Sequence, residues 1–145
     1  MNIGDKMPEF TLKDQDGNDF NIRDHAGKKL IVYFYPKNES GVCTKEACAF
    51  RDSYDEFEGK NTKVIGINAG SVESHKNFTK NHNLNFSLLS DPGNKVLKLF
   101  GIKNVLFLTG RETFVIDETG KITYKYRGFL NGNAHAEKTL EYLKQ

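Results

Sequence analysis

Hydrophobic residues in this chain of 145 residues gather in short runs separated by polar stretches, a pattern that predicts alternating strands and helices. The densest run is KKLIVYFY at positions 28–35, whose continuous β-branched and aromatic side chains predict a strand buried on both faces. The shorter runs KVIGIN (63–68) and NFSLLS (85–90) predict two more strands of this kind. Near the start, FTLKDQDGNDFNI (10–22) places Asp-Gly between two extended flanks and predicts a β-hairpin.

Helical patterns lie between and after these strands. The segment VESHKNFTKNH predicts a helix that Ser71 can cap, and NKVLKLF predicts a short helix that ends at Gly101. The segment AHAEKTLEYLK predicts a C-terminal helix, for which Asn133 is a candidate cap.

The order of these elements predicts the fold class. ETFVIDETGKITYKYRG adds two strands joined by a turn at Glu118–Gly120, so the chain ends with an antiparallel pair before its last helix. Strands that alternate with helices favour a mostly parallel sheet covered on both faces. We therefore expect residues 1–145 to form a single α/β domain, a thioredoxin-like sandwich with a mixed central sheet flanked by helices and an N-terminal β-hairpin.

Both cysteines lie on one predicted helix, which follows the loop after Pro36 and runs from about Val42 to Glu58, ending at Gly59. Its apolar side steps by four and three residues and forms a single buried stripe. The stripe consists of Cys43, Ala47, Phe50, Tyr54 and Phe57. Cys48 lies ~140° around the helix from Cys43, so we expect it to be partly exposed.

Composition and charge exclude several function classes. The chain has 21 basic and 19 acidic residues, so no strong field favours a nucleic acid or a membrane as partner. No apolar run approaches the ~20 residues that span a bilayer, and the start MNIGDKMPEF lacks the features of a secretory signal. We therefore expect a cytoplasmic protein, in which two cysteines are more often buried, catalytic or metal-binding than permanently bridged.

The spacing of the cysteines argues against a permanent disulfide between them. In a helix, Cys43 and Cys48 would have Cα atoms ~9 Å apart, with diverging side chains. A disulfide rarely tolerates more than about 7 Å. A bond between them therefore requires the first turns of the helix to unwind, which leaves a transient disulfide as an option.

Cys43 has the surroundings of a reactive thiolate. In the first turn of the helix, its sulfur is near unpaired backbone N–H groups and the positive end of the helix dipole, which favour the anion. Ser40, three residues earlier, can supply a hydroxyl either as the helix cap or as a donor to a bound ligand.

At these residues the sequence resembles the peroxiredoxins, specifically the bacterioferritin-comigratory-protein or PrxQ group. The active site of that family reads Pro-x3-Thr/Ser-x2-Cys, and Pro36, Ser40 and Cys43 fit this spacing. The resemblance extends over almost the whole chain, through GKKLIVYFYPK, SVESHKNFTKNHNL, LLSDPGNKV and RETFVIDETGKI.

The resemblance implies a role for each matching residue. Cys43 corresponds to the peroxidatic cysteine, which attacks the peroxide and becomes a sulfenic acid, and Cys48 to the resolving cysteine, which then forms an intramolecular disulfide with it. Ser40 corresponds to the hydroxyl that binds the peroxide, Pro36 to the residue that shields the sulfur, and Arg111 to the active-site arginine that stabilises the thiolate and the developing oxygen charge.

The resemblance also implies partners. It implies hydrogen peroxide and alkyl hydroperoxides as substrates, thioredoxin or a similar dithiol protein as reductant, no metal or organic cofactor, and a monomer or weak dimer. One motif departs from the group, because Ser40-Gly41-Val42 stands where Thr-Pro-Gly is common, and Gly41 gives this loop more freedom.

Other interpretations remain. A dithiol-exchange enzyme normally uses C-x2-C, and a copper-delivering protein of this fold uses C-x3-C, so the C-x4-C spacing favours neither function. A redox sensor or chaperone is a third alternative, because it would use the same Cys43 chemistry. Glu46 is interpreted as a helix-dipole charge or as a member of a structural ion pair. The histidines show no metal-ligand spacing and are expected on the solvated surface; they are His25, His75, His82 and His135.

Overall fold

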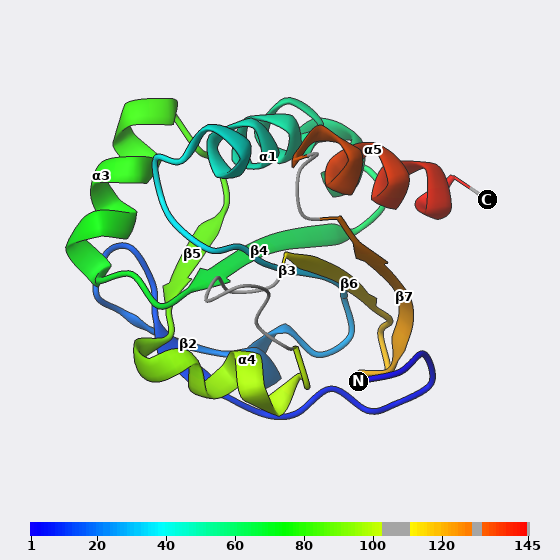
Figure 1. Ribbon diagram of the computed structural model, residues 1–145. Coiled ribbons are helices and arrows are strands. Elements are labelled where there is room, and N and C mark those ends of the chain that lie inside the picture. Colours follow the sequence, from blue (N-terminus) through cyan, green and yellow to red (C-terminus); the bar gives the residue numbers. More distant parts are fainter. Residues whose placement is uncertain (103–110, 129–131, 145) are drawn as a thin grey trace.

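The computed structural model describes residues 1–102, 111–128 and 132–144 of the chain. In these ranges, one sheet of seven strands forms the centre of the protein, in the order β2-β1-β5-β4-β3-β6-β7 (Figure 1). The strands are β1 (Thr11–Lys13), β2 (Asp19–Asn21), β3 (Lys29–Phe34), β4 (Thr62–Asn68), β5 (Ser87–Ser90), β6 (Glu112–Ile116) and β7 (Ile122–Arg127).

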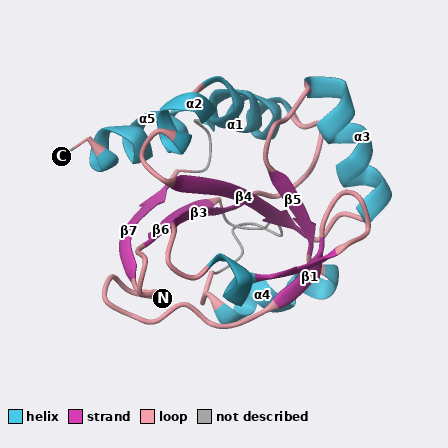
Figure 2. Ribbon diagram, turned by 180° about the vertical axis from the view of Figure 1, so that it is seen from behind, coloured by secondary structure: helices cyan, strands magenta, loops and turns pink. Residues whose placement is uncertain are grey.

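Helices cover both faces of this sheet, and Figure 2 shows α4 on the face opposite α1, α2 and α5. The α-helices are α1 (Gly41–Asp52), α2 (Tyr54–Glu58), α3 (Val72–His82), α4 (Lys95–Leu99) and α5 (Gly132–Leu143). Two 3-10 turns, η1 (Ile22–His25) and η2 (Pro92–Asn94), complete the described elements. In the described part of the chain, no helix combines the length and the apolar content that crossing a membrane requires.

Strand β3 is the centre of the core, as its continuous hydrophobic run predicts. Ile31 and Tyr33 pack in one hydrophobic cluster together with residues of α1, α2, α3 and α5. Val32 and Phe34 pack in a second cluster on the other face, together with residues of α4. Because side chains of a strand alternate between its faces, both clusters can draw on the same short segment.

The predicted sheet is confirmed. β3, β4 and β5 are parallel to one another, β6 and β7 form an antiparallel pair beside β3, and β1 and β2 form the N-terminal hairpin. Ser71 caps α3 by accepting a hydrogen bond from Ser74 N at 3.1 Å, and Gly101 follows α4 with a φ of +72°.

Two predicted helix boundaries are wrong. The single helix expected from Val42 to Glu58 is broken at Ser53, where ψ is 3° and the chain turns into α2; the buried stripe still continues from Cys43 to Phe57. Asn133 is not a cap, because α5 already begins at Gly132. Gly132 packs so closely on α1 that a Cβ atom there would lie 2.4 Å from the carbonyl oxygen of Val42.

Candidate active site

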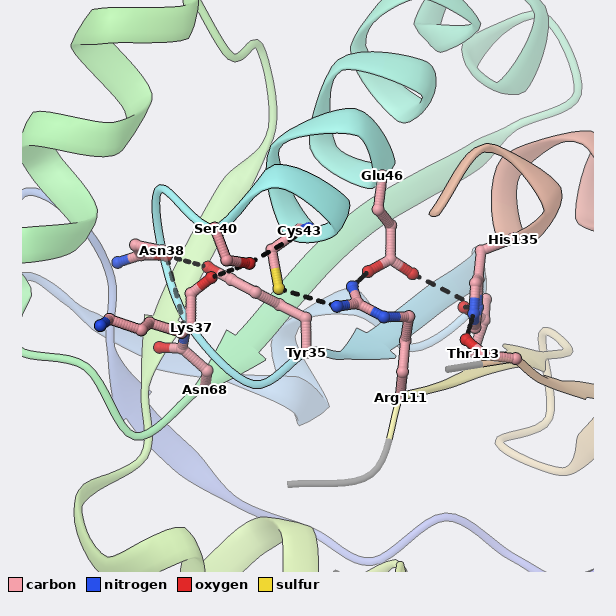
Figure 3. A network of polar contacts seen from close by, with 11 residues as sticks. Tyr35, Lys37, Asn38, Ser40, Cys43, Glu46, Asn68, Arg111, Thr113 and His135 are labelled. Atoms are coloured by element: carbon pink, nitrogen blue, oxygen red, sulfur yellow. Dashed lines mark hydrogen bonds and ion pairs between the residues drawn. The ribbon is translucent and has the colours of Figure 1, made fainter. Parts of the chain in front are cut away.

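The loop after β3 delivers Cys43 to the first turn of α1. Ser40 is the N-cap of this helix, and its hydroxyl accepts a hydrogen bond from Cys43 N at 3.3 Å (Figure 3). Cys43 is buried, with only 1 % of its surface exposed. The cap and the burial therefore fix the sulfur at the positive end of the helix dipole, as the sequence predicts.

A buried arginine contacts the Cys43 sulfur. Arg111 stands directly before β6, and its Nη2 donates to Cys43 Sγ at 2.9 Å. Its Nη1 binds Glu46 Oε1, so one guanidinium joins a thiol and a carboxyl group. Burial acts to lower the pKa of Arg111, but Glu46 and Cys43 outweigh it and raise that pKa. The arginine is therefore a permanent positive charge beside the sulfur.

Glu46 is the buried partner of Arg111, in line with the second of its two interpretations, a structural pairing. Its side chain is fully buried. Burial raises the pKa of Glu46 to about 8, although Arg111 acts in the opposite direction. Desolvation thus dominates over the attraction of the guanidinium for this carboxyl group.

His135 extends the network into α5 and corrects the expectation of a solvated histidine. It is fully buried, its Nε2 lies 2.7 Å from the carbonyl oxygen of Gly128, and its Nδ1 lies 2.7 Å from Thr113 Oγ1. The same Nδ1 is 3.3 Å from Glu46 Oε2 (Figure 3). Burial lowers the pKa of His135 to about 4, with a smaller contribution from Arg111.

A second buried network holds the loop before Ser40. Asn38 accepts a hydrogen bond from the Tyr35 hydroxyl at 2.7 Å, and its amide nitrogen lies 2.9 Å from both Ser74 Oγ and His75 Nδ1. Asn68 Nδ2 also approaches Asn38 Oδ1 at 3.4 Å. The network fastens the loop to the first turn of α3, and His75 is therefore buried and not solvated as expected.

Glu39 provides a third, more exposed attachment of this loop to α3. Its backbone is in the left-handed region, with a φ of +64°. Its carboxylate binds His82 Nε2 at 2.5 Å and Asn81 Nδ2 at 3.0 Å. These bonds lower the pKa of Glu39, that from Asn81 most. His82 is thus a half-buried hydrogen-bonding partner of Glu39 and not the solvated surface residue that was expected.

The predicted site residues fall into two groups. Ser40, Cys43 and Arg111 are brought together by the fold, and Pro36 is half-buried at the start of the same loop. Cys48 is half-buried and farther along α1, and both cysteines are free thiols. A bond between them would thus require this helix to open, as the spacing predicts.

Sequence reasoning missed the residues that support the site from behind. For two of them, His75 and His135, the helical periodicity of the sequence indicates a buried position. His75 precedes Phe78 by three residues, on the buried side of α3, and His135 stands between two alanines in a helix that packs closely on α1. Asn38 and Thr113 have no such signal, because their partners come from distant segments.

Comparisons with known proteins identify relatives of this chain. The model of the AhpC/TSA family matches residues 3–125. The chain is 46% identical to the chloroplastic Peroxiredoxin Q of Sedum lineare over 143 residues, which are 97% of this chain and 77% of that protein.

Solved structures extend the comparison to the fold. The peroxidoxin BcpB of Mycobacterium tuberculosis superposes with a TM-score of 0.92 at 33% identity, over 99% of this chain and 97% of that one. The bacterioferritin comigratory protein of Xanthomonas campestris, whose structures concern alkyl peroxide reduction, gives a TM-score of 0.87 at 30% identity, over 93% and 90% of the two chains.

These relatives correct one expectation and establish the identity. The cytoplasmic location expected from charge and hydropathy is wrong on this comparison, because the Sedum protein and further Peroxiredoxin Q relatives are chloroplastic. The family match over most of the chain, the identity to these relatives and the shared fold lead to one conclusion. The chain belongs to the AhpC/TSA family, as a peroxiredoxin of the Peroxiredoxin Q and bacterioferritin-comigratory-protein group.

Proposed function

We propose that this thiol peroxidase uses Cys43 as its peroxidatic cysteine. The observation that carries the proposal is the contact of Arg111 Nη2 with Cys43 Sγ at 2.9 Å, in which both side chains are buried. A buried thiolate needs a compensating charge, and the guanidinium supplies it. The same donor is placed to stabilise negative charge that develops on a peroxide oxygen next to the sulfur.

The chemical step needs little more from the protein than these groups. The Cys43 thiolate attacks the terminal oxygen of the peroxide; the S–O bond forms, the O–O bond breaks, and the electron pair leaves with the distal oxygen. That oxygen takes a proton and departs as water or an alcohol. Cys43 is oxidised to the sulfenic acid while the peroxide is reduced.

Ser40 and Pro36 complete the proposed peroxide site. The Ser40 hydroxyl is 3.3 Å from both Cys43 N and the carbonyl oxygen of Lys37. It therefore lies at the N-terminus of α1, beside the cysteine. In the proposal it hydrogen-bonds the bound peroxide. In the same proposal Pro36, which is half-buried at the start of this loop, shields the sulfur from water.

Cys48 is proposed to resolve the sulfenic acid. Its thiol condenses with the Cys43 sulfenic acid to give a disulfide and water, which protects Cys43 from further oxidation. Because both residues belong to α1, the first turns of this helix must open for each turnover. A thioredoxin-type dithiol protein then reduces the disulfide by thiol exchange.

Hydrogen peroxide and alkyl hydroperoxides are the proposed substrates. Support for the alkyl class comes from the Xanthomonas relative, whose structures concern alkyl peroxide reduction.

We propose that residues 1–145 form one peroxiredoxin domain, since the family match covers residues 3–125 and the described strands form a single sheet.

Two variants test the proposal. Cys48→Ser treated with one equivalent of peroxide should accumulate a sulfenic acid at Cys43 that a dimedone-type reagent traps. Cys43→Ser should lose rapid peroxide consumption, while Thr44→Ser, a neighbouring change that keeps both thiols, should retain it. If Cys43→Ser consumed peroxide as fast as the unchanged protein, the assignment would be wrong.

A further inference from the structure

A sealed chain of polar groups continues from Arg111 away from Cys43. It passes through Glu46 on α1, His135 on α5 and Thr113 on β6, and each of these three side chains is fully buried. It ends at the carbonyl oxygen of Gly128, which His135 Nε2 approaches at 2.7 Å. The C-terminal helix therefore contacts the support of the proposed active site.

The contact between Glu46 and His135 requires a proton. His135 Nε2 has a carbonyl oxygen as its partner, so this nitrogen carries hydrogen and donates it. Nδ1 then faces Glu46 Oε2 at 3.3 Å. Glu46 Oε2 is buried and has no hydrogen bond within the described part of the structure. A bare carboxylate oxygen and a bare imidazole nitrogen would repel each other there, so we infer that one proton lies at this contact, on either atom.

Thr113 accommodates both positions of that proton. Its hydroxyl, 2.7 Å from Nδ1, can donate to a neutral ring or accept from a protonated one. Burial raises the pKa of Glu46 and lowers that of His135, which places the proton on the carboxyl group. The pair nevertheless titrates as one unit that holds one proton.

The location of this proton affects the charge available to the thiolate. Arg111 contacts Glu46 with one nitrogen and Cys43 with the other. When the pair holds its proton, the three groups Arg111, Glu46 and His135 have a net charge of plus one, which balances a thiolate. When the proton is lost, the Glu46 carboxylate neutralises Arg111, and the thiolate becomes a second anion on a single cation.

We propose that His135 is a positioning residue of the peroxidase: by sharing one proton with Glu46, it keeps the positive charge of Arg111 available to the Cys43 thiolate. The inference rests on the proposed role of Cys43. It assigns a function to the C-terminal helix, which contributes no group to the peroxide site itself.

Other titratable groups face the Glu46–His135 pair. The phenols of Tyr33 and Tyr35 come from the β3 side, and burial raises the pKa of both well above the ordinary value, so they stay neutral. The ring of Tyr126 on β7 packs edge-on against His135, with centroids 4.8 Å apart. Among the described residues, Arg111 contacts Glu46 through Oε1 and Cys43 contacts Arg111, so neither of these contacts involves Glu46 Oε2.

The test measures the thiolate directly in a Cys48→Ser background, by the ultraviolet absorbance of Cys43 as the pH is raised. In His135→Asn the amide can donate to a Glu46 carboxylate but cannot hold the shared proton. We expect the ratio of thiolate to thiol near neutral pH to fall about tenfold, which corresponds to about one pKa unit. Adding Glu46→Gln, which fixes this side chain in an uncharged form, should restore the ratio.

A merely structural role of His135 predicts a different outcome. In that case the second change would not restore the thiolate, and the proposal would be overturned; it would equally be overturned if His135→Asn titrated like the parent. His25→Asn is the matched control, since His25 is half-buried, stacks on Phe20 and lies outside the network. It should leave the titration unchanged.

Infrared difference spectroscopy gives a readout that does not depend on the folding of the His135 variant. The otherwise unchanged protein should show the carbonyl band of a protonated carboxyl group near neutral pH, and Glu46→Gln should lack it. Absence of this band in the unchanged protein, together with a neutral His135 by nitrogen NMR, would overturn the shared proton. Neither result bears on Cys43 itself, which the Cys43→Ser variant tests separately.

Discussion

Arg111 Nη2 lies 2.9 Å from Cys43 Sγ, although 68 positions separate the two residues in the sequence. The sheet explains their proximity. β6 runs antiparallel to β3, with Glu112 opposite Phe34, so the residue before β6 arrives beside the end of β3, where the loop to Cys43 begins. A central strand pair thus fixes the positions of the arginine and of the helix that carries the cysteine.

Replacing this arginine should impair both thiolate formation and turnover. Arg111→Lys keeps a positive charge but loses the planar fork that contacts Cys43 and Glu46 together. We expect the rate constant for peroxide reduction to fall about a hundredfold or more, in the range found when one transition-state donor is removed. Stopped-flow measurement of the reaction with hydrogen peroxide provides the check.

Arg23→Lys is the control for that change. Arg23 is an exposed arginine on the 3-10 turn η1, where it pairs with Glu9 at 2.9 Å and is outside the contacts of Cys43 and Glu46. Its replacement should leave the rate within experimental error. An Arg111→Lys enzyme as fast as the control would show that the guanidinium contact does not contribute to the chemical step.

The parts of the fold that are visible in the sequence are those that local pattern determines. The run at 28–35 predicts β3 because a strand covered on both faces has to be apolar at every position. Ser71 and Gly101 mark helix ends because capping depends on neighbouring residues alone. Cys43 and Cys48 could be distinguished by helical periodicity, and their burial differs as predicted.

The supporting half of the site could not be predicted in this way. The sequence left Glu46 as either a helix-dipole charge or a member of a structural ion pair. Its burial depends on Arg111 and His135, which come from the start of β6 and from α5. The break of the long helix at Ser53 likewise could not be predicted, because the break is at a serine and not at a glycine or proline. Asn38 is a loop residue by composition, yet it is buried because Tyr35 and His75 satisfy its amide.

Ser40 should contribute to stability and catalysis in separable amounts. Ser40→Ala removes the acceptor of the Cys43 N–H group, which should lower the free energy of unfolding by about 1 kcal/mol. Ser40→Thr keeps the acceptor and should recover most of that loss. Urea unfolding measures the first effect, and the peroxide rate constant measures the second. If the hydroxyl only caps the helix, the rate constants of both variants should equal that of the parent.

Gly132 should be intolerant of a side chain although it lies in a helix. A Cβ atom there would lie 2.4 Å from Val42 O and 2.8 Å from Glu46 N, both in the first turns of α1. We expect Gly132→Ala to cost about 1–3 kcal/mol by overpacking and to increase amide exchange at the start of α1. Gly41→Ala is the contrasting control, since nothing lies within 4 Å of its Cβ position. Equal exchange in both variants would contradict this account.

The contact between Glu39 and His82 should slow the opening of the active-site loop. Glu39→Gln keeps a hydrogen-bonding side chain but removes the charge that faces His82. Because exposed pairs contribute about 1 kcal/mol at most, disulfide formation after one equivalent of peroxide should accelerate by no more than about fivefold. Glu73→Gln, on the exposed first turn of α3, is the control and should have no effect. A slower reaction in Glu39→Gln would refute the idea.

The stability of the protein should depend on pH in a manner that identifies the Glu46–His135 pair. The folded pKa of Glu46 is raised from 4.5 to about 8 and that of His135 is lowered from 6.5 to about 4. Between pH 4.5 and pH 6.5 the pair holds one proton in the folded protein, and the unfolded chain holds one proton on the histidine. In this range the two groups therefore cause no net pH dependence of the free energy of unfolding.

Above 6.5 the unfolded chain loses that proton while the folded protein retains it until about pH 8. The folded state then binds more protons, so the free energy of unfolding should decrease as the pH rises, by up to about 1.4 kcal/mol per pH unit. Urea unfolding of the parent and of Glu46→Gln at several pH values isolates this effect, because the other titratable groups are common to both. The parent should lose stability relative to the variant between 6.5 and 8, and parallel profiles would contradict the buried proton.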